Sequence, residues 1–237
     1  MVSNGSKSSS HRREKGVIDP VDDECASLRK TSRKAKIRRP LDKTALRDLA
    51  LSYVARFSTT ASKLEQYLAR KLRERGIAED EEGRVQELDV PGLVTDFVRR
   101  GYVDDDAYAR AKSRDLTGRG YGAKRVEQAL WAAGVDEAVR DDNAPSEAAS
   151  RRAVILLAKK RRFGPFSLGA DTETADGDPG ALSAARKKRE KQVAAMLRAG
   201  HSFEHVRFIM DASRTKDIED WLAEAEDDEN EETGRWS

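Results

Sequence analysis

The sequence predicts an all-α protein built from several small helical units stacked in tandem. Of its 237 residues, 38% are hydrophobic and 37% are charged, whereas an average globular domain has roughly 45–50% apolar and about 25% charged residues. Apolar residues recur at helical spacing along most of the chain, and no run alternates with the two-residue period of a strand. We therefore expect thin apolar stripes on many short helices rather than one large core.

Composition divides the chain into helical units and polar segments. Residues 1–40 carry 11 Lys or Arg and five Asp or Glu without an apolar period, which predicts a disordered basic arm. Residues 164–183 combine Gly-Pro and Pro-Gly steps with acidic side chains and predict a flexible linker. Residues 225–237 carry six acidic side chains and one basic, and predict a disordered acidic tail. The helical units are expected over residues 41–103, 104–163 and 184–224.

The first unit shows three helical stripes. Asp42 or Thr44 can cap its first helix, and Ser62 with Glu65 has capping-box spacing at the start of its second helix. Gly76 is expected to end the second helix, and a Val-Pro step at residues 90–91 begins the third. The apolar positions are Leu46, Leu49, Ala50, Tyr53, Val54 and Phe57 in the first helix, Leu64, Tyr67, Leu68 and Leu72 in the second, and Leu93, Val94, Phe97 and Val98 in the third.

The second unit is organised around residues 101–134. Asp104, Asp105 and Asp106 precede a helical stripe, where carboxylates cap the helix and complement its dipole. A glycine-rich bend at residues 118–122 leads into a second stripe, which Gly134 ends. The apolar positions are Ala107, Tyr108, Ala111 and Leu116 before the bend, Val126, Ala129, Leu130 and Ala133 after it, and Ala149, Ala153, Leu156 and Leu157 on a further helical face.

Three short segments align without gaps, at residues 64–68, 126–130 and 206–210. Each is expected to be the middle helix of a three-helix unit. A unit of about 50 residues buries little surface alone, so neighbouring units must stack.

Residues 118–124 resemble a phosphate-binding loop. Such a loop needs Gly directly before its Lys and Ser or Thr after it, because backbone amides surround the phosphates and the hydroxyl binds magnesium. Ala123 and Arg125 occupy those two places, and no strand pattern precedes the loop. We therefore interpret it as a flexible turn between helices and expect no nucleotide.

Metal and catalytic sites are not indicated either. Residues 201–205 spell His-Ser-Phe-Glu-His, a zinc-peptidase pattern, but Ser202 is expected to cap a helix and so to place His201 outside it. Capping explains the carboxylates at residues 104–106 more simply than a metal does. Cys25 is the single cysteine, so no intramolecular disulfide forms and a reducing cytoplasm is expected. We expect a non-enzymatic protein that needs no cofactor.

Basic side chains gather in four clusters, which are the candidate binding residues. Lys and Arg neutralise phosphates in a salt-dependent, sequence-independent manner, and they bind carboxylates of a partner protein equally well. The alternative for each cluster is a solvated helix face. The clusters are Arg70, Lys71, Arg73 and Arg75; Arg119, Lys124 and Arg125; Lys159, Lys160, Arg161 and Arg162; and Arg186, Lys187, Lys188, Arg189 and Lys191. The last cluster is expected at a helix N-terminus, where cations oppose the dipole, which favours a binding role.

An ordered set of residues resembles the central repeat of the RecX family, whose members bind and restrain the RecA recombinase. The set is Gly101-Tyr102-Val103-Asp104-Asp105, Tyr108-Ala109, Gly120, Arg125-Val126, Leu130 and Gly134, and the resemblance extends over residues 45–222. The chain departs from the family pattern in a longer second helix before Gly76, in a long linker at 164–183 and in the turn at residues 199–203.

The resemblance implies an elongated array of three tandem three-helix repeats. It also implies a monomeric regulator that binds along the groove of a RecA–single-stranded DNA filament and limits filament extension or ATP turnover.

A second function is left open by the sequence: a helix-turn-helix-like regulator that binds DNA without RecA. Its recognition helix should carry Arg, Asn or Gln base-readers on one face, and no stretch does so convincingly. A membrane protein is not expected, because no apolar run approaches the roughly 18–20 residues of a bilayer span.

Overall fold

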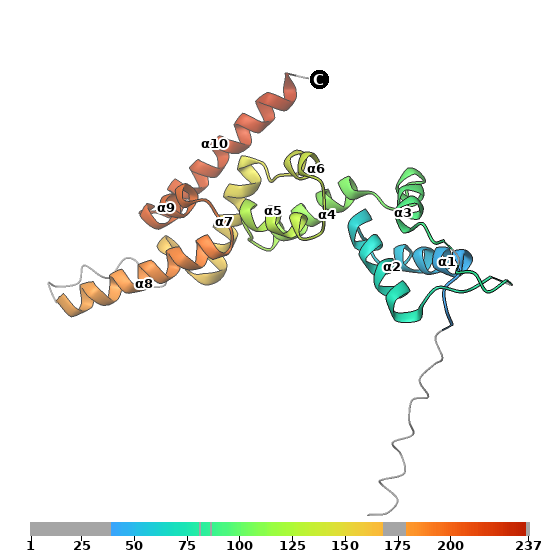
Figure 1. The fold of residues 1–237 in the computed structure, drawn as a ribbon. Helices are drawn as coiled ribbons and strands as arrows, with labels where there is room; N and C mark the ends of the chain where they lie inside the picture. The colour runs from blue at the N-terminus through green and yellow to red at the C-terminus, as the bar shows by residue number, and fades with distance from the viewer. Residues whose placement is uncertain (1–38, 81, 86, 168–178, 236–237) are drawn as a thin grey trace, which may run out of the picture. The chain divides into compact units, whose positions relative to one another are not determined.

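The computed structural model describes residues 39–80, 82–85, 87–167 and 179–235, and this part of the chain is all-α, as predicted. Its extended pairings are two isolated bridges, Leu41 with Ile77 and Glu79 with Val85. The helices are α1 (Lys43–Val54), α2 (Ala61–Arg75), α3 (Val90–Arg99), α4 (Asp105–Gly118), α5 (Ala123–Trp131), α6 (Glu137–Asp142), α7 (Glu147–Arg161), the 3-10 helix η2 (Gly164–Phe166), α8 (Pro179–Arg198), α9 (Phe203–Asp211) and α10 (Thr215–Gly234) (Figure 1). None of these helices has the length and apolarity that crossing a bilayer requires.

The first core lies among α1, α2 and α3. Asp42 caps α1 by accepting a hydrogen bond of 2.7 Å from the backbone amide of Ala45, and Gly76 ends α2 with a φ of 79°. Phe57 lies beyond the end of α1 and is exposed, so the predicted apolar stripe is too long by one turn. The buried residues are Leu41, Leu46, Ala50, Leu64, Leu68, Val90, Val94, Phe97 and Val103.

The start of α2 differs from the predicted capping box. Thr60 is the cap, and its hydroxyl oxygen accepts from the amide of Lys63 at 3.2 Å. The same hydroxyl donates to the carbonyl of Ala133 at 2.5 Å, and a carboxylate oxygen of Asp105 accepts from the amide of Ala61 at 2.9 Å. Contacts from the end of α5 and the start of α4 therefore select Thr60, and sequence spacing alone does not show them.

Two further cores divide α4–α10 between them. Val126 and Leu130 of α5 are buried in one, and Val206 and Met210 of α9 are buried in the other, at the positions expected of middle helices. The apolar face of α7 packs into the same core as α8, α9 and α10, and the unit boundary at residue 163 stays a prediction. Helix α7 also contacts α4, since it carries four consecutive apolar residues at 154–157 that cannot share one face. The equivalence of three units as repeats stays a prediction.

The polar segments are shorter than predicted. Helix α8 begins at Pro179, so the linker does not extend to residue 183. Helix α10 continues to Gly234 and buries Ala225, so the prediction of a disordered acidic tail is wrong for residues 225–234. The predicted basic arm, apart from residues 39 and 40, and Cys25 lie outside the described residues, as do residues 168–178 of the linker.

Candidate partner-binding surface

The glycine-rich turn between α4 and α5 is a packed joint rather than a flexible turn. The amide of Gly122 donates to the carbonyl of Ala199 at 2.9 Å, and the amide of Lys124 donates to the carbonyl of Gly200 at 3.1 Å. A Cβ atom at Gly122 would overlap the carbonyl of Gly200, so the two backbones touch directly. The amides of Gly122 and Lys124, at the start of α5, therefore already donate to carbonyls of the turn before α9.

His201 completes this joint. Ser202 caps α9, so His201 precedes the helix as predicted. The His201 side chain is 2% exposed, and its Nε2 atom donates to the carbonyl of Gly120 at 3.0 Å. Burial lowers the pKa of His201 below its ordinary value, although the hydrogen bond to Gly120 opposes the shift. Across the described part of the chain, no group of three His, Cys, Asp or Glu side chains is placed to hold a metal.

The acidic triplet serves three different contacts. Asp104 caps α4 by accepting from the backbone amide of Ala107, as predicted. Asp105 instead accepts from the backbone amide of Ala61 at the start of α2, and Asp106 accepts from the side-chain amide of Asn143 at 2.8 Å. Burial, the largest influence, raises the pKa of Asp105 above its ordinary value. These carboxylates therefore join α4 to its neighbours.

The first predicted basic cluster, at the end of α2, is partly used by its own helix. Arg70 and Lys71 approach the carboxylate of Glu74 at 3.7 Å and 2.5 Å, and both cations lie over the ring of Tyr67. Arg73 and Arg75 are in the last turn, where cations stabilise the helix dipole. This cluster consequently has a structural role that accounts for most of its charge.

The second and third clusters lie at helix ends. In the second, Arg119 pairs with Asp115 at 2.8 Å, while Lys124 and Arg125 are exposed on the first turn of α5. In the third, Lys159 lies over the ring of Phe166 at 5.6 Å from the ring centroid. Lys160, Arg161 and Arg162 are exposed at the end of α7, and Arg162 has the left-handed conformation that ends the helix.

The fourth cluster does not lie where the sequence placed it. Because α8 starts at Pro179, residues 186–191 are in the middle of a 20-residue helix, and the argument from the dipole of a helix N-terminus is wrong. Arg189 donates to the carbonyl of Met210 at 2.7 Å and pairs with Asp211, so it holds the end of α9. Arg186 pairs with Glu190 within α8. Lys187, Lys188 and Lys191 are exposed and pair with no carboxylate of the described chain; they line a shallow hollow beside Phe163.

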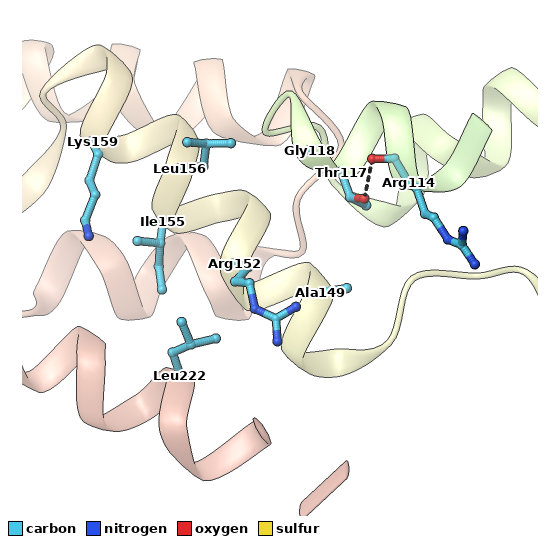
Figure 2. A pocket seen from close by; sticks show the side chains of 9 residues that line it. All are labelled: Arg114, Thr117, Gly118, Ala149, Arg152, Ile155, Leu156, Lys159 and Leu222. Carbon is cyan, nitrogen blue, oxygen red and sulfur yellow. Dashed lines mark hydrogen bonds between the residues drawn. The ribbon is translucent and has the colours of Figure 1, made fainter. Parts of the chain in front are cut away.

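A larger groove lies among α4, α7 and α10 and has a volume of about 540 Å³. Its apolar lining comes mainly from Ile155 and Leu156 of α7 and Leu222 of α10, and its cations are Arg114, Arg152 and Lys159. Figure 2 shows Ile155 and Leu222 pointing toward one another, with Arg114 and Lys159 on opposite sides of the groove.

Of the predicted site residues, the structure brings only Lys159 to this groove. Arg114 and Arg152 were missed because neither belongs to one of the four basic clusters along the chain. The signal that could have found the groove is the run Val-Ile-Leu-Leu at residues 154–157. The side chains of four consecutive residues point in different directions around a helix, so they cannot all face one core. At least one of them must contact another element or stay exposed.

The side of α7 next to the groove is covered by the acidic part of α10. Arg151 donates to the carbonyl of Trp221 at 2.5 Å, stacks over its ring, and approaches Glu224 at 3.3 Å. Arg152 pairs with Glu226 at 2.9 Å. Glu229 accepts from the backbone amide of Ala148 at 2.8 Å and so caps α7.

Glu147, in the first turn of α7, links this surface to α9. Its carboxylate accepts from Arg151 at 2.7 Å and lies 3.0 Å from the Nε2 atom of His205. Burial, the largest single influence, raises the pKa of Glu147, but the Arg151 hydrogen bond and the proximity of His205 together outweigh it. The pKa of Glu147 therefore lies below its ordinary value.

Comparison with known proteins relates the chain to a regulatory protein. No family model matches the chain. The "Regulatory protein RecX" of Myxococcus xanthus (strain DK1622) is 30% identical over 189 residues, which are 78% of this chain and 94% of that protein. The crystal structure of RecX from Lactobacillus salivarius has a similar fold, with a TM-score of 0.50 at 19% identity over 70% of this chain and 93% of that one. A further crystal structure of regulatory protein RecX has a TM-score of 0.49 at 20% identity over 72% of both chains.

Proposed function

This chain belongs to the RecX family of regulatory proteins, and on that premise we propose that it regulates the RecA recombinase by binding the RecA–single-stranded DNA filament. Binding limits filament extension and ATP turnover by occupying filament subunits. The action requires neither a catalytic group nor a cofactor, since contacts made to several subunits reinforce one another.

The observation that carries this proposal is a set of exposed lysines on α8, Lys187, Lys188 and Lys191, that pair with no carboxylate of the described residues. Every described residue from 180 to 191 in α8 is exposed, so this half of the helix buries no side chain in the described chain. Lys187 and Lys191 are four residues apart, and Lys188 and Lys191 are three apart, so the three ammonium groups share one face. Helical segments of this size are marginal without tertiary contacts, and a bound partner supplies them.

The chemistry of this face suits both components of a nucleoprotein filament. Ammonium groups bind phosphates of DNA and carboxylates of a protein through the same charge attraction. Exposed pairs of this kind weaken as salt rises, because the Debye length falls from about 10 Å at 0.1 M to about 3 Å at 1 M ionic strength. Binding through α8 should therefore depend strongly on salt.

The test replaces Lys187, Lys188 and Lys191 together by Ser and measures RecA ATPase on single-stranded DNA against regulator concentration. We expect the concentration for half-inhibition to rise about tenfold, and the salt dependence to become shallower, because three ionic contacts are lost. Arg186 and Arg189 are kept, because both already have partners in the fold.

The matched control replaces three exposed cations of the first unit, Lys43, Arg47 and Arg56, by Ser. It removes the same charge, and we expect less than a twofold change. A wild-type chain that leaves RecA ATPase and filament length unaltered at every concentration would contradict the proposed function. Equal curves for the α8 variant and the wild type would instead assign these lysines to a solvated face.

A further inference from the structure

We propose that the groove among α4, α7 and α10 binds an acidic segment of the partner protein, which places one apolar side chain against Leu156 and carboxylates against Arg114 and Lys159. This inference rests on the proposed function only for the identity of that partner, RecA. The class of segment follows from the groove itself (Figure 2).

The floor of the groove leaves an apolar side chain open to solvent. Leu156 is 41% exposed, although the residues on either side of it, Ile155 and Leu157, are buried. Leu222 of α10 closes the groove opposite Ile155. An inserted Leu, Ile or Met side chain would bury Leu156 and gain the transfer free energy that its exposure now forgoes.

The rim offers cations to such a segment. Arg114 and Lys159 are both exposed, and neither pairs with a carboxylate in the part of the chain that the structure describes. The single proton of the Thr117 hydroxyl is already used, because it is shared between the carbonyls of Ser113 and Arg114. Polar recognition in this groove therefore depends on positive charge, which selects carboxylates.

The chain itself shows that this side of α7 binds an acidic helix. Glu226 of α10 pairs with Arg152 at the edge of the groove, two turns before Lys159 on the same helix. A partner segment that carries carboxylates would extend this mode of recognition to Lys159 and Arg114. It would also compete with Glu226 for Arg152.

A polynucleotide fits the groove less well. Bases stack on aromatic rings in single-strand sites, whereas the groove is lined by aliphatic side chains and has no aromatic residue among its described lining. Glu226 of α10 pairs with Arg152 at the edge of the groove, and Glu219 is three residues before Leu222, which puts it on the same face of that helix. A continuous phosphate backbone would meet these carboxylates, while a peptide can place its charges selectively.

The first experiment measures the Kd of the full chain for purified RecA, with and without single-stranded DNA. Leu156→Glu is expected to raise Kd at least tenfold, and the double variant Arg114→Ser with Lys159→Ser about tenfold. The matched control is Val98→Glu, since Val98 is similarly exposed, at 45%, but lies on α3, outside both the groove and α8. It should change Kd less than twofold.

Two further variants distinguish a lost contact from misfolding, because they should change the Kd in opposite directions. Leu156→Ala adds no charge and should weaken binding about threefold even if the glutamate variant fails to fold. Glu226→Gln releases Arg152 and should tighten binding about threefold, an effect that general damage to the fold would not produce. Weaker binding by Glu226→Gln would overturn the proposal.

The partner segment is identified by placing a photo-crosslinking benzoylphenylalanine at position 156 and mapping the product on RecA. We expect a segment with at least two Asp or Glu beside an apolar residue, and a crosslink to a basic segment would overturn the inference. Unaltered RecA binding by both groove variants would also overturn it, while leaving the proposed function intact. Loss of binding to an oligothymidine without loss of binding to free RecA would instead make the groove a nucleic-acid site. A wild-type chain that binds no RecA in either form would overturn the proposed function and the named partner together.

Discussion

The arginines of α7 and the lysines of α8 look alike in sequence but differ in the structure. Arg151 and Arg152 each have a carboxylate from the acidic part of α10, and Arg151 also has a carbonyl and an aromatic ring. Lys187, Lys188 and Lys191 have no such partner within the described chain. The comparison teaches that a basic cluster indicates a binding surface only after the acidic segments of the same chain have been placed.

Removing residues 224–237 tests the structural side of this comparison and should have the largest effect. Helix α7 would lose the cap from Glu229, the carboxylate beside Arg152 and the buried Ala225. We expect the free energy of unfolding to fall by about 2–3 kcal/mol, measured by urea denaturation. An unaltered unfolding midpoint would mean that the acidic part of α10 does not stabilise α7.

Substituting Arg151 and Arg152 separately compares the stability that a nearly buried ion pair contributes with the stability that an exposed ion pair contributes. Arg151→Ala should cost about 1.5–3 kcal/mol, because this side chain is only 15% exposed and loses hydrogen bonds to Glu147 and Trp221. Arg152→Ala should cost less than about 1 kcal/mol, because its side chain is 55% exposed and screened by solvent. Chemical denaturation of both variants checks the ranking, and equal losses would contradict it.

The pH dependence of stability sharpens the Arg151 result. Because the folded pKa of Glu147 is lowered, its ionised form contributes stability above the unfolded pKa, and that stability is lost as pH falls through the folded value. Arg151→Ala removes the hydrogen bond that lowers this pKa. The acid-induced loss of stability due to Glu147 should therefore shrink in the variant.

His201 should have a smaller effect on the pH dependence of stability, and here the buried side chain must stay uncharged. Its folded pKa is lowered by burial, so the unfolded chain binds more protons between that lowered value and 6.5. Stability is therefore full above pH 6.5 and falls as pH drops through this window. His201→Gln keeps a donor for the carbonyl of Gly120 and should flatten the curve of unfolding free energy between neutral and mildly acidic pH. A variant curve as steep as that of the wild type would assign the acid sensitivity to other groups.

Helical spacing predicted most of the fold, because an apolar stripe on a helix depends on local sequence. The middle-helix positions at residues 64–68, 126–130 and 206–210 begin and end with buried residues, as expected, and Asp42, Gly76 and Asp104 act at the predicted helix ends. The errors arose where distant contacts decide. Residues 225–234 have little apolar character, and they are helical where carboxylates from α10 meet the amide and arginines of α7.

The candidate surface was harder to predict than the fold. The family resemblance came from a set of turn glycines, acidic caps and apolar positions, and the relationship to RecX confirms it. The groove, in contrast, takes Arg114, Leu156 and Leu222 from three helices that are separate in the sequence. No local sequence pattern predicts a groove assembled in this way. The prediction relied on runs of basic residues, and several of these runs lie at helix C-termini, where cations also stabilise the helix dipole.

The backbone contact between Gly122 and Gly200 has a consequence for how this chain can diverge. Each glycine borders main-chain atoms of the opposite turn, so a side chain at either position cannot be accommodated by trimming a neighbouring side chain. Arg114, Leu156 and Lys159 of the groove and the lysines of α8 carry no such restriction, since their side chains are exposed. Substitutions at these exposed positions can therefore change which partner the surface binds, while the packed pair of turns that holds α5 against α9 stays the same.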